Sequence, residues 1–192
     1  MQLQQVKPFI LNKLEKELPE YLSYHSIDHV MDVYEAAQSL GSVENIGEHD
    51  LELLLTAALF HDSGFMSGLK DHEEASCKIA KEYLPGFGYS MEDIEKISGM
   101  IMATKLPQAP KNLLEEIICD ADLDYLGRDD FFQISNNLYN EFKATGAVQN
   151  ENEWNKLQVS FFESHHYFTA SAQKLRQKLK QENLLAIKSK IK

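Results

Sequence analysis

The stretch LELLLTAALFHDSG, residues 51–64, decides the fold. After Glu52 it is apolar on nearly every side of a helix, which is typical of a helix at the centre of a hydrophobic core. This helix is expected to end in the pair His61-Asp62. An ionised carboxylate at the rim of a core is unfavourable unless a cation or several hydrogen-bond donors compensate its charge. A metal ion compensates it well, so His61 and Asp62 mark a candidate metal site.

Outward from this helix, apolar residues recur at three- and four-residue spacing, whereas alternating β-branched runs bounded by turn residues do not occur. The chain is therefore expected to be all-α, with about seven helices. Pro19 should end the first helix, and Ser26 should cap the second. Gly41 and Gly64 should end the second and third. Helical segments are expected over residues 3–18, 26–40, 49–62 and 71–85, from residue 90 onward, and over residues 111–126, 129–145 and 151–182.

The composition indicates one globular unit with an acidic surface. The chain has 192 residues, 43% of them hydrophobic, which is enough for one good core, so a single domain over residues 1–192 is expected. The formal net charge is −11, and the surface as a whole therefore repels duplex nucleic acid. A small anionic substrate would need local positive charge, which a bound divalent metal ion supplies at one point. Nothing in the composition indicates an oligomeric state.

The sequence holds two cysteines, Cys77 and Cys119, each among apolar helix-like neighbours. Neither belongs to a Cys-x-x-Cys pair or a disulfide-rich framework, so both are expected to be reduced core residues. The N-terminal stretch MQLQQVKPFILNKL has no continuous apolar signal core, and no uncharged hydrophobic stretch approaches the ~18 residues that span a bilayer. A cytoplasmic protein without a membrane partner is expected.

A second His-Asp pair, His49-Asp50, stands at the polar start of the same central helix. Aspartate is common in the first turn of a helix, where its charge opposes the positive end of the helix dipole. This second pair is therefore expected to be structural. A His-Asp pair alone is not a specific signal, and the metal-site hypothesis needs further residues.

Three motifs in a fixed order supply them: YHSIDH at residues 24–29, ALFHDSG at 58–64 and IICDADLDYLG at 117–127. Together they resemble the HD-domain superfamily of metal-dependent phosphohydrolases, and the resemblance covers residues 20–130. It implies an HD-type helical bundle, on which residues 129–192 pack. It also implies that four side chains from three helices meet at one metal ion. The matching positions are His29, His61, Asp62 and Asp122.

The resemblance implies one divalent metal ion as cofactor. Imidazole with carboxylate suits Mn²⁺, Fe²⁺, Co²⁺, Ni²⁺ and Zn²⁺, and Mg²⁺ stays open as well. His29 is favoured as a ligand over His25, because Ser26 is expected to start the helix after His25. The resemblance favours Asp122, which matches the family position, and Asp120 is the fallback. Residues two positions apart do not share a helical face, so Asp120 and Asp124 cannot accompany Asp122 as ligands.

The resemblance also suggests catalytic residues. Asp62 is predicted to accept the proton of the attacking water. His72 and Glu73 are predicted to be catalytic because they open the next helix, where relatives carry residues for a second metal or for the phosphate. An ordinary acidic helix start is the alternative. Residues 99–107, GMIMATKLP, contain no histidine, so a complete second metal site of the usual kind is not expected.

His25, Lys105 and His166 are predicted to bind substrate. Lys105 stands in a short apolar loop, where it would hold a phosphate oxygen as a point charge; a solvated surface lysine is the alternative. His165 and His166 are expected on a long aromatic-rich C-terminal helix, with one of them facing the cavity; a core or surface histidine is the alternative for each. For His25 the alternatives are support of a metal ligand and an ordinary loop residue. The basic tail from Lys174 is expected to be a solvated helical face.

These features predict a metal-dependent hydrolase that cleaves a small phosphate-containing substrate through a metal-activated water. A nucleotide is the expectation at the level of the family. Two alternatives stay open, a nucleotide-binding sensor or regulatory HD module without turnover and a di-iron HD-type oxygenase. The intact ligand positions count against the first, and the lack of histidine in residues 99–107 counts against the second.

Overall fold

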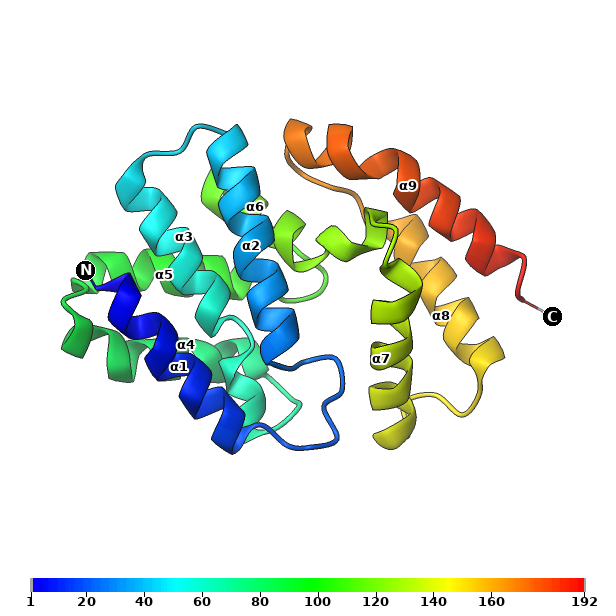
Figure 1. Cartoon of the computed structure of the whole chain (residues 1–192), viewed down its shortest axis with the longest axis horizontal. Helices are drawn as coiled ribbons and strands as arrows, with labels where there is room; N and C mark the ends of the chain where they lie inside the picture. Colours follow the sequence, from blue (N-terminus) through cyan, green and yellow to red (C-terminus); the bar gives the residue numbers. More distant parts are fainter. Residues whose placement is uncertain (1, 192) are drawn as a thin grey trace.

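The structure is a computed structural model that describes residues 2–191. Within these residues the protein is all-helical and contains no strand, which confirms the predicted fold class. Figure 1 shows α1–α5 gathered on one side of the molecule and α7–α9 on the other, with α6 between them. The α-helices are α1 (Leu3–Glu17), α2 (Ile27–Val43), α3 (Glu48–Phe60), α4 (His72–Tyr83), α5 (Met91–Ala103), α6 (Leu113–Asp122), α7 (Phe131–Ala144), α8 (Glu151–Ser164) and α9 (Ala170–Lys188). Three short 3-10 helices connect them, η1 (Ser63–Ser67), η2 (Leu84–Phe87) and η3 (Asp124–Gly127).

The main core is built around α3, as the sequence predicted. Every residue from Leu53 to Phe60 is buried. Neighbouring helices surround α3, which packs against α1, α2, α5 and α6. Because a helix that is apolar on all sides must be covered on all sides, this packing fixes the position of its C-terminal end. The pair His61-Asp62 follows directly from that end.

The second helix does not end at Gly41, as the sequence predicted, but continues to Val43. Gly41 is buried inside α2, and a Cβ atom at this position would lie 3.0 Å from Ile46 Cδ1 and 3.1 Å from Leu51 Cδ1. The glycine therefore serves the close approach of α2 to the start of α3 and does not act as a helix stop.

The single helix predicted over residues 151–182 is wrong, because the chain leaves the helical conformation between Ser164 and Ala170. His165 and His166 lie in this break and not on a helix. The cause is Asp120, whose fully buried carboxylate accepts hydrogen bonds from the backbone N–H groups of Phe168 and Thr169, both at 2.8 Å. The hydroxyl of Thr169 also donates to Asp120, at 2.7 Å, and caps α9 by accepting from the Ala172 N–H.

The basic tail is not uniformly solvated. The prediction of a solvated face is wrong for two of its basic residues, Arg176 and Lys180. Lys180 is buried and donates to the backbone oxygen of His165. Arg176 forms two hydrogen bonds, of 2.7 and 2.9 Å, with the buried carboxylate of Asp124. Such bidentate pairs are strong and directional, so they attach α9 to η3.

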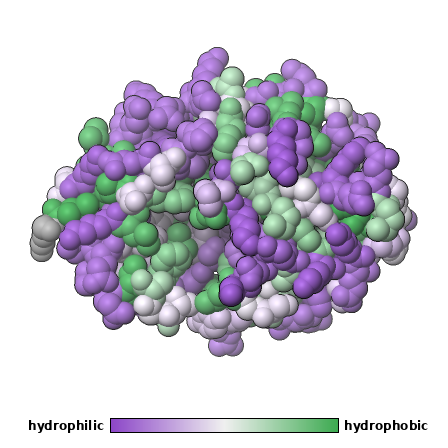
Figure 2. Space-filling model, turned by 180° about the vertical axis from the view of Figure 1, so that it is seen from behind, coloured by the Kyte–Doolittle hydropathy of each residue, from purple (hydrophilic) through white to green (hydrophobic). Residues whose placement is uncertain are grey.

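Hydrophilic residues cover much of the molecular face in Figure 2, with hydrophobic patches between them. Within residues 2–191, every helix is too short or too polar to cross a bilayer. The cytoplasmic location, the single domain over residues 1–192 and the motif region over residues 20–130 stay predictions.

Cys77 and Cys119 are both buried and free, in agreement with their predicted place in the core.

The role of Asp120 can be tested by Asp120→Ala. Its removal leaves two buried backbone N–H groups without an acceptor, so we expect the free energy of unfolding, measured by urea denaturation, to fall by about 3 kcal/mol. Asp129→Ala is the control, because Asp129 is exposed, and it should change stability by less than about 0.5 kcal/mol. Equal effects of the two substitutions would contradict this account of the helix break.

Candidate metal centre

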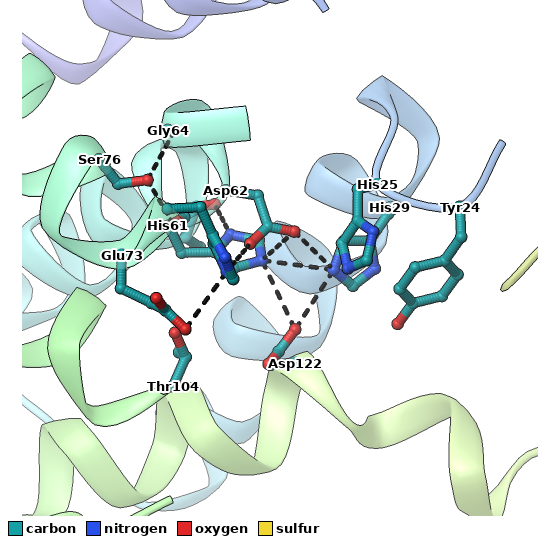
Figure 3. Close-up of polar contacts among 12 residues, drawn as sticks. Tyr24, His25, His29, His61, Asp62, Gly64, Glu73, Ser76, Thr104 and Asp122 are labelled. Carbon is teal, nitrogen blue, oxygen red and sulfur yellow. Dashed lines mark hydrogen bonds and ion pairs between the residues drawn. The ribbon is translucent and has the colours of Figure 1, made fainter. Parts of the chain in front are cut away.

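The four predicted metal ligands come together where three helices meet (Figure 3). His29 lies in the first turn of α2, and Asp122 is the last residue of α6. His61 and Asp62 follow the end of α3. Since α2 packs against both α3 and α6, the ends of these helices converge. The four residues lie around one point, in agreement with the prediction. Their role as metal ligands stays a prediction.

The distances between the donor atoms fit a common metal ion. His29 Nε2 and His61 Nε2 are 3.3 Å apart, and each lies 3.2–3.5 Å from Asp62 Oδ2 and from Asp122 Oδ1. Ligands bound to one ion at about 2.0–2.2 Å are separated by roughly 3.0–3.5 Å when they are neighbours in a tetrahedral or octahedral arrangement. His29, His61 and Asp122 thus form a group that could hold a metal, and Asp62 adjoins both imidazoles.

The orientation of the imidazoles suits ligation. His61 Nδ1 donates to the backbone oxygen of Ala58 at 2.8 Å, which leaves the lone pair of Nε2 for the centre. The ring of His29 packs against the Tyr24 ring, with 4.5 Å between their centroids. Both side chains are therefore held with Nε2 toward the two carboxylates.

Asp62 is buried and Asp122 is partly buried, and their negative charges need a cation. Asp62 Oδ2 is shielded from solvent and lies 3.2 Å from His61 Nε2 and 3.4 Å from His29 Nε2. Burial would raise the pKa of the Asp122 carboxyl, but hydrogen bonds from His29 and His61 outweigh burial and lower its pKa to about 2. Burial would lower the pKa of the His61 imidazole, but the Asp62 charge and hydrogen bonds to both aspartates hold it well above its ordinary value. The residues thus fit a divalent ion, which would replace the protons shared among them.

A serine on α4 fixes the turn that carries the His-Asp pair. Ser76 Oγ donates to the backbone oxygen of His61 and accepts from the backbone N–H of Gly64, both at 2.7 Å (Figure 3). The hydroxyl thus pairs a backbone carbonyl left free at the end of α3 and a backbone N–H left free at the start of η1. This serine carries no recognisable motif, and the sequence analysis did not identify it.

Gly64→Ala tests the close approach of η1 and α4. A Cβ atom at residue 64 would lie 1.9 Å from the backbone oxygen of His72, so one backbone segment would have to move. We expect the free energy of unfolding to fall by roughly 3 kcal/mol in thermal or urea denaturation. At Gly86 an added Cβ meets nothing within 4 Å, so Gly86→Ala should be neutral within about 0.5 kcal/mol. A loss in Gly64→Ala no larger than in Gly86→Ala would argue against the close approach.

A cavity of about 560 Å³ borders the centre and gathers most of the predicted site residues. Its wall includes His25, Asp62, His72, Glu73, Lys105 and Asp122. His166 is exposed beside Phe168, and it is not among the residues that line the cavity. Because His166 lies in the helix break, the structure does not bring it together with the other predicted substrate-binding residues.

His72 and Glu73 begin α4 next to the centre. His72 Nε2 lies 3.4 Å from Glu73 Oε1 and 3.6 Å from Asp62 Oδ1. The His72 ring stacks on Phe65, with 4.0 Å between centroids, and the ring of His25 contacts the same Phe65 at 4.2 Å. The two histidines therefore reach the cavity from neighbouring positions beside Asp62.

Lys105 lines the cavity but is already paired with carboxylates. Its ammonium group donates to Glu74 Oε1 and lies 3.4 Å from Asp71 Oδ1. The hydrogen bond to Glu74, partly offset by desolvation, raises the pKa of Lys105. Its positive charge is thus shared with two acidic residues at the edge of the cavity.

His25 is anchored by Glu141 of α7, a residue that the sequence analysis missed. Glu141 Oε2 accepts from the backbone N–H groups of Tyr24 and His25 at 3.0 and 3.1 Å, and Oε1 pairs with His25 Nδ1. This leaves His25 Nε2 as the ring nitrogen available to a ligand. An acidic residue within an amphipathic helix gives no signal of such a long-range contact.

Glu141→Gln tests this anchor. Glutamine replaces the carboxylate with a neutral amide that has a single acceptor oxygen, so the charge-assisted hydrogen bonds to the two backbone N–H groups and to His25 Nδ1 are weakened. We expect the free energy of unfolding to fall by about 1–3 kcal/mol. Amide exchange of Tyr24 and His25 should also become faster, as measured by hydrogen–deuterium exchange. Glu151→Gln, at an exposed position on α8, should change neither quantity, and unchanged exchange in Glu141→Gln would overturn the anchor.

The second His-Asp pair lies outside the centre. His49 Nε2 forms an ion pair of 3.1 Å with Asp93 Oδ1, beside the capping box that Ser90 and Asp93 form at the start of α5. His49 thus makes a structural contact at a half-exposed position, as the sequence analysis predicted.

A family model described as HD domain matches residues 26–124, which is more than half of the chain. The chain therefore belongs to the HD-domain family, as its three motifs predicted. The matched range begins just before His29 and ends just after Asp122, so all four candidate ligands fall within it.

Three known proteins are similar to this chain. An uncharacterised protein from Clostridium beijerinckii is 34% identical over 82 residues, which are 41% of this chain and 51% of that protein, so the match spans about half the length of the curated relative. A crystal structure of a predicted HD superfamily hydrolase from an uncultured Thermotogales bacterium aligns over 95% of this chain and 89% of its own, with 22% identity and a TM-score of 0.65. A crystal structure from Lactobacillus plantarum aligns over 98% of this chain and 95% of its own, with 18% identity and a TM-score of 0.67. The two alignments show that this chain shares its fold with both crystal structures over nearly its whole length.

Proposed function

We propose that this protein is a metal-dependent phosphohydrolase that acts on a small phosphate-containing substrate. The observation that carries the proposal is that Asp62 Oδ2 and Asp122 Oδ1 each lie 3.2–3.5 Å from two imidazole nitrogens, at the wall of a cavity of about 560 Å³. Membership of the HD-domain family supports it. The cavity falls within the range of about 300–1,000 Å³ that is usual for small-molecule sites.

The four residues around the centre would hold one divalent ion. When bound, such an ion polarises a phosphoryl oxygen and makes a water molecule acidic enough to attack phosphorus near neutral pH. Asp62 turns Oδ2 toward the imidazoles of His29 and His61 and lies with Oδ1 3.6 Å from His72 Nε2. Because one of its oxygens faces away from the ion site, Asp62 is suited to accept the proton of the attacking water.

The phosphate would lie between the centre and the histidines of the cavity wall. His72 is close enough to Asp62 to donate a hydrogen bond to a phosphate oxygen bound there. His25 presents Nε2 nearby, since its Nδ1 is engaged by Glu141. Lys105 contributes positive charge at the rim, where Glu74 positions its ammonium group.

The test is hydrolysis by His61→Ala and Asp62→Ala variants loaded with Mn²⁺, Co²⁺, Ni²⁺ or Mg²⁺ and screened against phosphomonoesters and nucleotides. We expect the wild-type protein to bind about one ion per chain, and both variants to lose the ion and about 100-fold or more of the activity while circular dichroism shows a retained fold. His49→Ala is the matched control, because it removes the histidine of the other His-Asp pair, and it should retain both metal and turnover.

Three results would contradict the proposal. Unchanged turnover in both variants would show that the centre does not catalyse the reaction. Saturable nucleotide binding without any turnover would indicate a sensor or regulatory module. An iron content near two per chain with consumption of O₂ would indicate an oxygenase.

A further inference from the structure

The cavity beside the metal centre is much larger than a phosphate group needs, and its far part has a different character. Away from Asp62 and Asp122 it extends into a region that we name the apolar arm. The arm is lined by Leu126 of η3, Leu138 and Phe142 of α7, and Trp154, Leu157 and Phe161 of α8. In Figure 1 these helices form the side of the molecule opposite α1–α5. One continuous cavity thus joins a charged end to an apolar end.

The arm offers little to a polar ligand. Gln158 is the amide side chain of its α8 wall, and both ends of this amide are engaged, since Oε1 accepts from Ser135 Oγ at 2.6 Å and Nε2 donates to Asn155 Oδ1 at 3.4 Å. A nucleobase carries several hydrogen-bonding groups on its edge. Burying them against this wall would leave them unpaired, which is unfavourable.

Some apolar side chains that line the cavity also remain exposed. Leu69 and Leu157 are each 44% exposed, and Leu106 is 59% exposed, although all three line the cavity. Leu69 and Leu106 belong to the charged end, where Lys70 and Lys105 are their neighbours in sequence, and Leu157 belongs to the arm. Exposed apolar groups along one cavity are typical of a surface that an apolar ligand covers.

We infer that the substrates are phosphate monoesters of apolar alcohols, with the phosphate at the metal centre and the alkyl or aryl group in the apolar arm. This inference rests on the proposed phosphohydrolase function and names its substrate class. The charged end supplies the imidazoles of His25 and His72 and the ammonium group of Lys105 to the phosphate, and the arm removes the apolar group from water. Binding energy from the apolar group then places the phosphorus next to Asp62.

The experiment measures kcat/KM of the Mn²⁺-loaded protein for methyl, butyl and hexyl phosphate and for uridine 5′-monophosphate. We expect kcat/KM to rise about two- to fourfold for each added methylene, because each one buries more apolar surface, and hexyl phosphate should exceed the nucleotide. Equal kcat/KM for the three alkyl phosphates, or a preference for the nucleotide, would overturn the inference.

A substitution in the arm provides a second measurement. Leu157→Asn changes a half-exposed residue, so the fold should persist, and it should lower the ratio of kcat/KM between hexyl and butyl phosphate by about threefold. Leu175→Asn is the matched control, because Leu175 is 56% exposed on α9 and is not among the residues that line the cavity. It should leave that ratio unchanged. An equal ratio in the two variants would show that the arm does not hold the alkyl chain.

A binding experiment separates this inference from the proposed function. Trp154 is the single tryptophan of the chain and lies in the wall of the arm, so its fluorescence reports occupancy without turnover. Hexylphosphonate, which is not hydrolysed, should shift the Trp154 emission to shorter wavelength in a saturable manner, and methylphosphonate should not. If hexylphosphonate produces this shift while no phosphate ester is cleaved, the hydrolase proposal fails and the apolar arm stands. If esters are cleaved but Trp154 does not respond, the arm is not the substrate site.

Discussion

Two carboxylates and two imidazoles share one buried corner of this protein, and their charges constrain the packing around them. Asp62 and Asp122 are held in ionised form by the histidines beside them, and Asp62 Oδ2 is shielded from solvent. Such an arrangement is stable only if positive charge is shared among the four groups. The ends of α2, α3 and α6 must therefore meet at fixed distances, and Ser76 of α4 completes the turn that carries Asp62.

The corner itself could be predicted because its signals are local. The apolar run before His61 identifies a central helix, and a carboxylate at its end requires a cation. The order of three short motifs then assigned His29 and Asp122. The all-helical fold could be predicted for a similar reason, since three- and four-residue spacing of apolar residues is visible within each segment. The start of α5 also has a local cause, because Ser90 and Asp93, three residues apart, form a capping box there.

The features that escaped prediction depend on contacts between distant segments. Glu141 is an ordinary acidic residue until the loop at Tyr24 and His25 packs against α7, 116 residues away in sequence from His25. Asp120 was the fallback ligand, yet its carboxylate binds the backbone of Phe168 and Thr169 and interrupts a helical pattern that has no proline or glycine to mark the break. Local propensity favours a continuous helix there, and tertiary hydrogen bonds override it.

Helix α7 takes part in both ends of the cavity at once. Leu138 and Phe142 of this helix line the apolar arm of the cavity. Glu141 of the same helix binds the backbone N–H groups of Tyr24 and His25. A shift of this helix by a fraction of its pitch would therefore alter the shape of the wall and the placement of the His25 ring together. The shape of the cavity wall and the placement of the His25 ring are therefore coupled through α7. An evolutionary change in one would require compensation in the other.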